Sequence, residues 1–71
     1  MGDTNGQIKA ALMALLDAIR RSDGVVVSRE MEKLEGILVR DRPSLAPQLA
    51  HFIERRSYAK ALAYLEAEGA A

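Results

Sequence analysis

Two apolar clusters in the last third of the chain cannot lie on one face of a straight helix, and this mismatch constrains the fold most. The clusters, in "LAPQLAHFIERR" and "SYAKALAYLEAE", consist of Leu45, Leu49, Phe52 and Ile53, and of Tyr58, Ala61, Leu62 and Leu65. In one continuous helix, at about 100° per residue, the second cluster would point about 180° away from the first. Such a rod would need partners on both sides. A corner at Arg56–Ser57 lets both clusters share one core, so we predict helices over 45–55 and 57–68, with Ser57 as N-cap.

A helix over about 4–21 is expected at the start of the chain. Thr4 followed by Gln7 is typical of a capping box, in which each side chain satisfies a free amide of the other residue. The pair Arg20–Arg21 suits the negative end of the helix dipole, and Gly24 offers a left-handed stop. Its large apolar stripe consists of Ile8, Leu12, Leu15, Leu16 and Ile19, and a roughly opposite stripe of Ala10, Ala11, Ala14 and Ala18. Because this helix is apolar most of the way round, we expect it at the centre of the bundle or in an interface.

A second helix is expected over 28–39, with Ser28 as its N-cap. The spacing of one helix face is followed by Val27, Met31, Leu34 and Leu38. Gly36 inside this helix either marks the close approach of another helix or is tolerated on the surface, and both alternatives stay open. The helix ends before Pro43, because the residue preceding a proline is pushed out of the α region, and Ser44 can cap the next helix.

These segments predict an all-α fold, a compact bundle of four short antiparallel helices at about 4–21, 28–39, 45–55 and 57–68. A chain of 71 residues suffices for one domain, taken as 1–71 with frayed ends at 1–3 and 69–71. A core of this size contributes only a few kcal/mol net, so small domains often carry a disulfide or a metal. The chain has no cysteine and a single histidine, which excludes disulfides and a His/Cys zinc site. Self-association or a larger partner is the stabilising device that remains.

Charge and hydropathy narrow the classes of partner. Ten Lys and Arg residues balance ten Asp and Glu residues, whereas nucleic-acid binders usually carry a basic excess. No stretch approaches the roughly 18 apolar residues of a membrane-spanning helix, and the start "MGDTNGQ" lacks the layout of a secretory signal. We therefore expect a cytoplasmic, soluble protein that does not bind membranes, which the lack of cysteine suits.

Residues 45–68 resemble a single tetratricopeptide-like helix–turn–helix unit. The matching positions are Phe52 late in the first helix, Ser57 and Tyr58 opening the second, then Ala61 and Leu65. The chain departs from the pattern at Gln48 and Leu49, at Arg56 in place of the turn glycine, and at Glu68 in place of a small residue. Residues 1–42 show no second copy. The resemblance implies a surface that binds proteins or peptides, and no catalytic activity.

His51 is the only side chain whose ordinary pKa lies near neutrality, so it is the first candidate for chemistry. Its helical neighbours are Gln48, Glu54 and Arg55, which do not make a metal site. The serines that could act as nucleophiles are better explained, in three of four cases, as helix caps. We therefore interpret His51 as an ordinary helix residue, and we expect no catalytic residue, no metal and no cofactor.

The carboxylates of the second helix are interpreted as a solvated face. Glu30, Glu32 and Glu35 alternate with Arg29 and Lys33, which gives mixed pairs three residues apart. Paired carboxylates can do acid–base work only where a hydrophobic pocket separates their pKa values. Glycine-rich phosphate loops are absent as well, so no nucleotide site is indicated.

Large apolar residues that one core does not need predict an interface. A single core could be filled by Ile8, Leu12, Leu15, Ile19, Met31, Leu34, Leu38, Leu49, Phe52, Tyr58, Leu62 and Leu65. The predicted interface residues are Met13, Val25, Val26, Ile37, Val39 and Tyr64, together with the alanine stripe. On so small a body they predict an apolar patch, and its simplest use is two-fold self-association. We expect a homodimer that buries part of the first helix and the "VVV" segment, with Tyr64 as an anchor.

The leading hypothesis is a small non-enzymatic helical module that binds itself, a protein partner, or both. The alternative is a small nucleic-acid-associated or regulatory protein with an anion patch made of Arg20, Arg21, Arg40, Arg42, Arg55 and Arg56. Each of these arginines also suits the C-terminus of a predicted helix. The only candidate for a recognition helix carries three glutamates, which repel phosphates, so nucleic acid is the less favoured partner.

Overall fold

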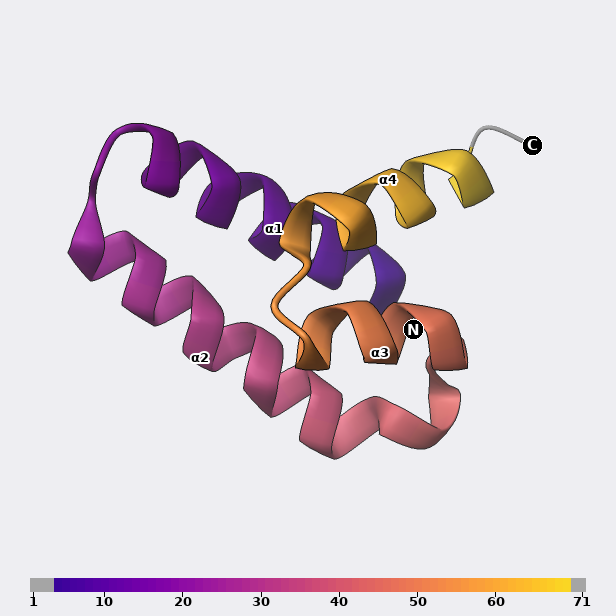
Figure 1. Ribbon diagram of the computed structural model, residues 1–71. Coiled ribbons are helices and arrows are strands. Elements are labelled where there is room, and N and C mark those ends of the chain that lie inside the picture. The colour runs from indigo at the N-terminus through magenta and orange to yellow at the C-terminus, as the bar shows by residue number, and fades with distance from the viewer. Residues whose placement is uncertain (1–3, 70–71) are drawn as a thin grey trace.

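The computed structural model describes residues 4–69, which form helices and turns without a strand (Figure 1). Its elements are α1 (Thr4–Arg20), α2 (Gly24–Asp41), the 3₁₀ turn η1 (Arg42–Ser44), α3 (Pro47–Glu54) and α4 (Tyr58–Gly69). The predicted all-α bundle of four helices is confirmed. Of the ends expected to fray, 1–3 and 70–71 lie outside the described residues, whereas Gly69 belongs to α4.

The corner predicted at Arg56–Ser57 is present, and it turns the chain back on itself. Arg56 is left-handed, with φ of 58°. The N–H of Ser57 donates to the carbonyl of Phe52 at 2.8 Å, and the N–H of Arg56 donates to that of Ile53 at 3.0 Å. This pair of bonds is a Schellman motif, which satisfies the last carbonyls of α3. Ser57 then takes the N-cap position, because its carbonyl accepts the N–H of Ala61 at 2.9 Å.

Because the chain turns here, both apolar clusters face one core, as predicted. Leu49 and Ile53 of α3 and Ala61 and Leu65 of α4 belong to the same buried cluster. The radius of gyration is 11.5 Å, close to the roughly 11 Å of a compact domain of this length.

The corner between α1 and α2 repeats this geometry and corrects two predictions. Ser22 is left-handed, with φ of 59°, whereas no described glycine has a positive φ, so Gly24 is not the predicted left-handed stop. The N–H of Asp23 donates to the carbonyl of Ala18 at 2.8 Å, and the Asp23 side chain accepts the N–H of Val26 at 3.3 Å. Asp23 is therefore the N-cap of α2, and the predicted N-cap Ser28 lies inside the helix. An aspartate cap and the packing of Val27 on the core outweigh the β preference of the "VVV" segment.

The third helix also begins later than expected. Ser44 belongs to η1 and does not cap α3, which starts at Pro47 with Ala46 as N-cap. A proline at the first helical position is favourable because its missing N–H would have no partner there.

Replacing Arg56 with glycine should raise the free energy of unfolding by about 1 kcal/mol, because a residue with a Cβ is strained in the left-handed region. Ser22→Gly should act in the same direction. The matched control is Arg55→Gly, since Arg55 has φ of −84°, and there glycine should lower stability by about 0.5–1 kcal/mol. Urea denaturation at one protein concentration measures all three variants. Equal losses for Arg55→Gly and Arg56→Gly would contradict the strain at Arg56.

The four helices form a closed ring around the core. Helix α1 packs on α2 and α4, and α3 packs on the same two helices from the other side (Figure 1). The largest fully buried side chains are Ile8, Leu12, Leu15, Leu34 and Leu49. Within the described residues, no helix combines the length and the apolar character needed to cross a bilayer.

Two isoleucines exchange the places expected from the sequence. Ile19 was expected in the core but is 50% exposed, whereas Ile37 was expected in the interface but is only 5% exposed. Ile19 lies in the last turn of α1, next to the start of α4, which covers it only in part. On α2 the buried positions are Glu30, Leu34, Ile37 and Leu38. This stripe is centred further toward Ile37 than the predicted one, so Ile37 points inward and Met31 is only half-buried.

Candidate functional site

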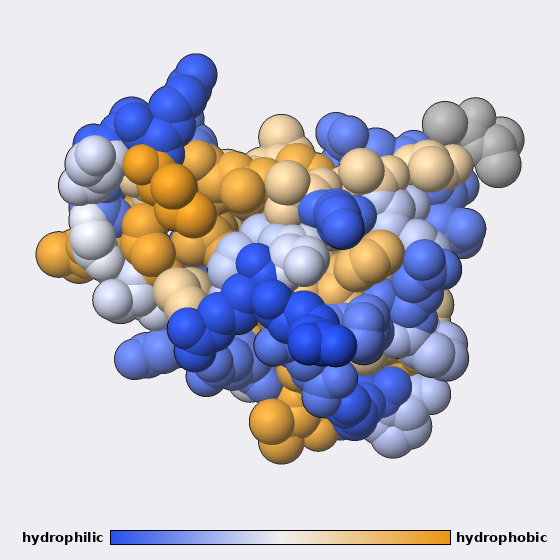
Figure 2. All heavy atoms as spheres, in the orientation of Figure 1, coloured by the Kyte–Doolittle hydropathy of each residue, from blue (hydrophilic) through white to orange (hydrophobic). Residues whose placement is uncertain are grey.

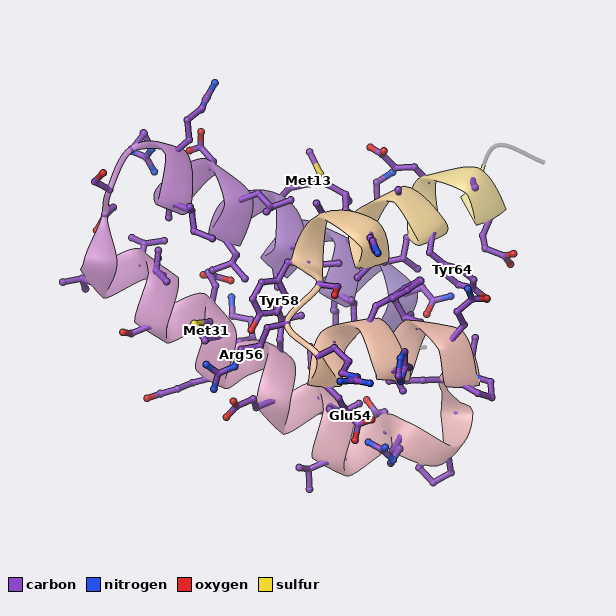
Figure 3. All side chains as sticks on the ribbon, viewed as in Figure 1. Met13, Met31, Glu54, Arg56, Tyr58 and Tyr64 are labelled. Atoms are coloured by element: carbon purple, nitrogen blue, oxygen red, sulfur yellow. The ribbon has the colours of Figure 1, made fainter. Side chains whose placement is uncertain are left out.

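A partly exposed apolar surface covers α1 and the start of α4. We call it the α1–α4 face, and it consists of Met13, Leu16, Ile19, Tyr58, Ala59 and Leu62. These residues line two shallow hollows of about 360 and 320 Å³ that share Leu16. Met13 is 52% and Ile19 is 50% exposed. Apolar atoms gather over α1 in the space-filling view (Figure 2), and Met13 points away from the bundle (Figure 3).

Charged side chains stand at the edges of the α1–α4 face. Asp17 accepts a hydrogen bond from Arg20 at 2.7 Å and pairs with Arg21 at 2.9 Å. The hydrogen bond from Arg20, and then the charges of Arg21 and Arg20, lower the pKa of the Asp17 carboxyl against the opposing effect of desolvation. Along the other edge lie Arg56 and Lys60, neither of which has an ion pair within residues 4–69.

Removing the Arg20 side chain, as in Arg20→Gln, should raise the pKa of Asp17 toward its ordinary value. Because folding lowers this pKa, the pairs stabilise the fold above the ordinary pKa of an aspartate, and this stabilisation is lost as the pH falls through the lowered value. NMR titration of the Asp17 carboxyl carbon measures the shift. Arg40→Gln, at the far end of α2, is the control and should leave the titration unchanged. An Asp17 curve that Arg20→Gln does not move would refute the assignment.

Tyr58 supplies a polar tip within the α1–α4 face. Burial raises the pKa of its phenol, the charge of Glu35 adds to this, and Arg56 opposes both. The hydroxyl therefore stays protonated at neutral pH and can donate a hydrogen bond. Figure 3 shows the ring pointing from α4 toward α2.

The structure does not gather the predicted interface residues into one patch. Met13 belongs to the α1–α4 face, but Val25 and Val39, which are 78% and 82% exposed, lie near opposite ends of α2. About 21 Å of helix separates those two valines. Val26 is half-buried, Ile37 is buried, and the Tyr64 ring packs edge-on against Phe52 with centroids 6.4 Å apart. Sequence reasoning missed Leu16, Ile19, Ala59 and Leu62 as surface residues. For Leu16 and Ile19 the signal was that the first helix is apolar nearly all round, whereas Ala59 and Leu62 on α4 had no such signal.

The six arginines of the predicted anion patch are also kept apart. Arg20 and Arg21 share Asp17 at the end of α1, Arg40 pairs with Asp41 at 3.0 Å, and Arg42 pairs with Glu54. The first two stand at one end of α2 and the next two at its other end, with 18 residues between, or about 27 Å. Arg55 and Arg56 lie at the corner after α3. Most of the positive charge is thus paired, and it does not converge on one surface.

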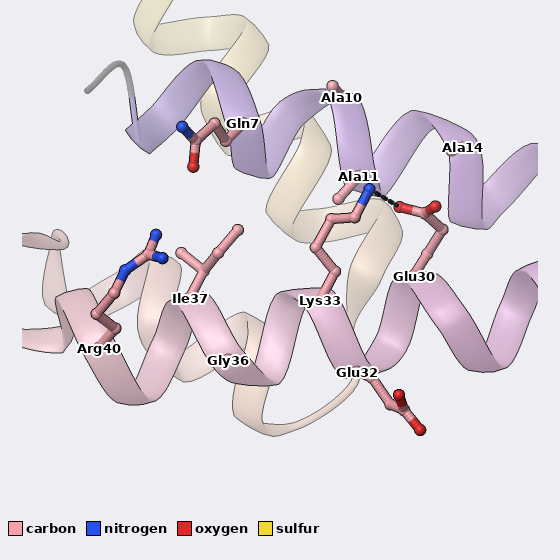
Figure 4. A pocket seen from close by; sticks show the side chains of 10 residues that line it. All are labelled: Gln7, Ala10, Ala11, Ala14, Glu30, Glu32, Lys33, Gly36, Ile37 and Arg40. Carbon is pink, nitrogen blue, oxygen red and sulfur yellow. Dashed lines mark ion pairs between the residues drawn. The ribbon is translucent and has the colours of Figure 1, made fainter. Parts of the chain in front are cut away.

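A groove runs between α1 and α2 (Figure 4). We call it the α1–α2 groove; its volume is about 500 Å³, and its lining is Gln7, Ala10, Ala11, Ala14, Glu30, Glu32, Lys33, Gly36, Ile37 and Arg40. Three alanines line the groove from α1, and Gly36 is the one small lining residue on α2. No atom outside the helix backbone lies within 4 Å of the point where a Cβ would stand on Gly36. This glycine therefore does not mark a close approach within the chain, and it leaves open space in the groove.

Glu30 departs from the solvated face predicted for the glutamates, because it is only 3% exposed. Its Oε2 lies 3.5 Å from Arg29 Nε, and its Oε1 lies 3.3 Å from Lys33 Nζ. The contact with Lys33 is an ion pair without hydrogen-bond geometry, so Oε1 accepts no hydrogen bond. Figure 4 shows Glu30 and Lys33 rising from α2 toward α1, whereas Glu32 points away.

No arrangement for metal binding is found among residues 4–69, since no three His, Cys, Asp or Glu side chains are close enough to hold an ion. His51 is exposed, with its ring 6.3 Å from that of Phe52. The expectation of a non-enzymatic protein stays a prediction.

Comparison with known proteins gives no relative: no protein-family model matches the chain, and neither does a curated protein or a solved structure. The tetratricopeptide-like pattern of residues 45–68 therefore stays a prediction. Function has to be inferred from the α1–α4 face and the α1–α2 groove.

Proposed function

We propose that this protein is a small non-enzymatic interaction module that self-associates through the α1–α4 face as a two-fold dimer. The observation that carries this proposal is the continuous apolar surface of α1 and α4, in which Met13 and Ile19 are each about half exposed. A face that pairs with its own copy places every apolar residue opposite the same surface of the partner. The tetratricopeptide-like pattern supports a protein partner as well, and the lack of cysteine suits the cytoplasm, where we place the protein.

The energetics support self-association of such a small domain. Fully burying a large apolar side chain stabilises by about 1.5–3 kcal/mol, so covering a half-exposed one contributes roughly 1 kcal/mol. A two-fold interface counts Met13 and Ile19 twice, and it also covers Leu16 and Leu62. With a core this small and no disulfide, the added burial is a large fraction of the total stability.

Salt should separate this function from nucleic-acid binding. Arg56 and Lys60 lie at the edge of the face and have no ion pair within residues 4–69, so two copies repel slightly and added salt screens that repulsion. Binding to nucleic acid would weaken steeply with salt, because counterions are released from the phosphates.

Sedimentation equilibrium at micromolar concentration should give twice the chain mass of 7.8 kDa for the wild type. Ile19→Glu should weaken the dimer at least about tenfold, which corresponds to 1.4 kcal/mol, because it places a charge in the apolar interface. Val39→Glu is the matched control, since Val39 is an exposed aliphatic residue near a helix C-terminus but lies outside the face. A wild-type monomer at every concentration, or equal masses for the two variants, would defeat the proposal.

A further inference from the structure

The structure points to a second binding site that is separate from the α1–α4 face. We infer that the α1–α2 groove receives a helix of a partner protein, and that an arginine of this helix brings its guanidinium to the buried carboxylate of Glu30. The groove and the α1–α4 face share no residue. The inference therefore stands whether or not the protein self-associates.

The hydrogen bonding of Glu30 indicates a cationic ligand. Its side chain is 5% exposed, yet Oε1 accepts no hydrogen bond. A buried carboxylate oxygen that accepts no hydrogen bond is costly, because the ion pair with Lys33 at 3.3 Å replaces only part of its lost hydration. The nearest cation, Lys33, is 54% exposed on its side chain and can move aside. The other oxygen, Oε2, accepts a long hydrogen bond of 3.5 Å from Arg29 Nε, so Oε1 is the open acceptor. A guanidinium directs planar N–H donors at a carboxylate oxygen, with a geometry that the ammonium of Lys33 does not reach here.

The small residues of the groove indicate that the ligand comes close to the backbone. Glycine is the least favourable residue in a helix interior after proline. At Gly36 the chain's own packing gives no reason for glycine, since nothing lies within 4 Å of the missing Cβ. Ala10 and Ala14 line the same groove from α1. Helix pairs that approach closely carry small residues at the contact, so this lining suits a docked helix.

The length of the groove favours a helix over a compact small molecule. Its lining residues on α2 extend from Glu30 to Arg40, a distance of about 15 Å or nearly three helical turns. Glu30 lies toward one end of this stretch, so a helix lying along it can bring one side chain to the carboxylate. Along α2 the lining is charged at both ends, at Glu30 and Arg40, and carries Gly36 and Ile37 between them. This arrangement matches the helix-in-groove mode of recognition.

The test is an NMR titration of the full chain with a defined probe, an alanine-based helical peptide with one central arginine. The same peptide with citrulline is the neutral isostere. We expect chemical-shift changes at Gln7, Ala10, Lys33 and Gly36, and at least about tenfold weaker binding of the citrulline peptide, since charge-assisted bonds are the strong ones. Glu30→Gln should weaken binding of the arginine peptide by a similar factor, and Gly36→Leu, which fills the open space, should abolish it.

The control variant is Glu35→Gln, because this exposed carboxylate lies on the same helix but does not line the groove. Its affinity should stay within about twofold of wild type, as expected for a screened surface charge. Thermal unfolding of each variant confirms that the fold is kept. The inference is overturned if the arginine peptide causes no shifts in the groove at millimolar concentration, or if Glu30→Gln binds it as tightly as wild type. It is also overturned if free ethylguanidinium binds as tightly as the peptide, because the helix would then contribute nothing.

Discussion

Replacing Leu34 with alanine should lower the free energy of unfolding by about 3 kcal/mol, within the range of 2–5 kcal/mol for a buried leucine. Leu34 is 1% exposed and belongs to the core that all four helices share. Deleting its side chain removes the transfer free energy and leaves a cavity that rigid helices cannot close. A domain of 71 residues has a total stability of about 4–10 kcal/mol. The variant should therefore be partly unfolded at room temperature or in low urea.

Val39→Ala is the matched control, because it shortens an aliphatic side chain on the same helix at a position 82% exposed. It should change stability by no more than about 0.5 kcal/mol. Circular dichroism in urea, at one protein concentration, measures both variants. Similar losses for the two would mean that Leu34 is not part of a single tight core.

Replacing Glu30 with methionine should raise the free energy of unfolding by about 1–2 kcal/mol. The carboxylate is buried, and neither of its contacts, to Arg29 at 3.5 Å and to Lys33 at 3.3 Å, is short. A charge in such a site is stabilised too little to offset its lost hydration, and apolar replacements of similar volume are often more stable. Both cations are more than half exposed and return to water.

Glu32→Met serves as the control, since it makes the same exchange on the exposed side of α2 and should stay within about 0.5 kcal/mol of wild type. Urea denaturation compares the two. If Glu30→Met is less stable than wild type, the ion pairs of Glu30 hold the fold, and the carboxylate is no longer evidence for a ligand. If it is more stable, the chain keeps Glu30 at a cost to its own stability, as expected for a binding residue.

The fold could be predicted where the angular positions of apolar residues around a helix were sufficient. The opposed clusters required a corner near Ser57, and no property of distant residues entered that prediction. The start of α2 could not be found in the same way. "VVV" has β preference and Gly24 resembles a stop, but the left-handed position falls at Ser22, a residue type with no preference for it. The Asp23 cap and the packing of Val27 against the core set the start of α2.

The candidate sites were less predictable, because they depend on how two helices meet. The small residues Ala10, Ala14 and Gly36 were visible in the sequence. Only the packing of α1 on α2 shows that they line one groove. For Glu30, the alternation of charges indicated exposure, yet α1 covers this side of α2. Which apolar residue of a helix points inward, as for Ile37 on α2, and which stays exposed, as for Ile19 on α1, is likewise set by how each helix is rotated against its neighbours.

The closed ring of helices has a consequence for how the protein is made. Helix α4 is synthesised after the other three, yet it covers one side of α1, the first helix. That side of α1 stays open to water until residues 58–69 have left the ribosome. The bundle can then close only across most of the chain, a non-local step that slows folding. Chaperones that bind apolar nascent segments can therefore meet the uncovered side of α1 before α4 packs onto it.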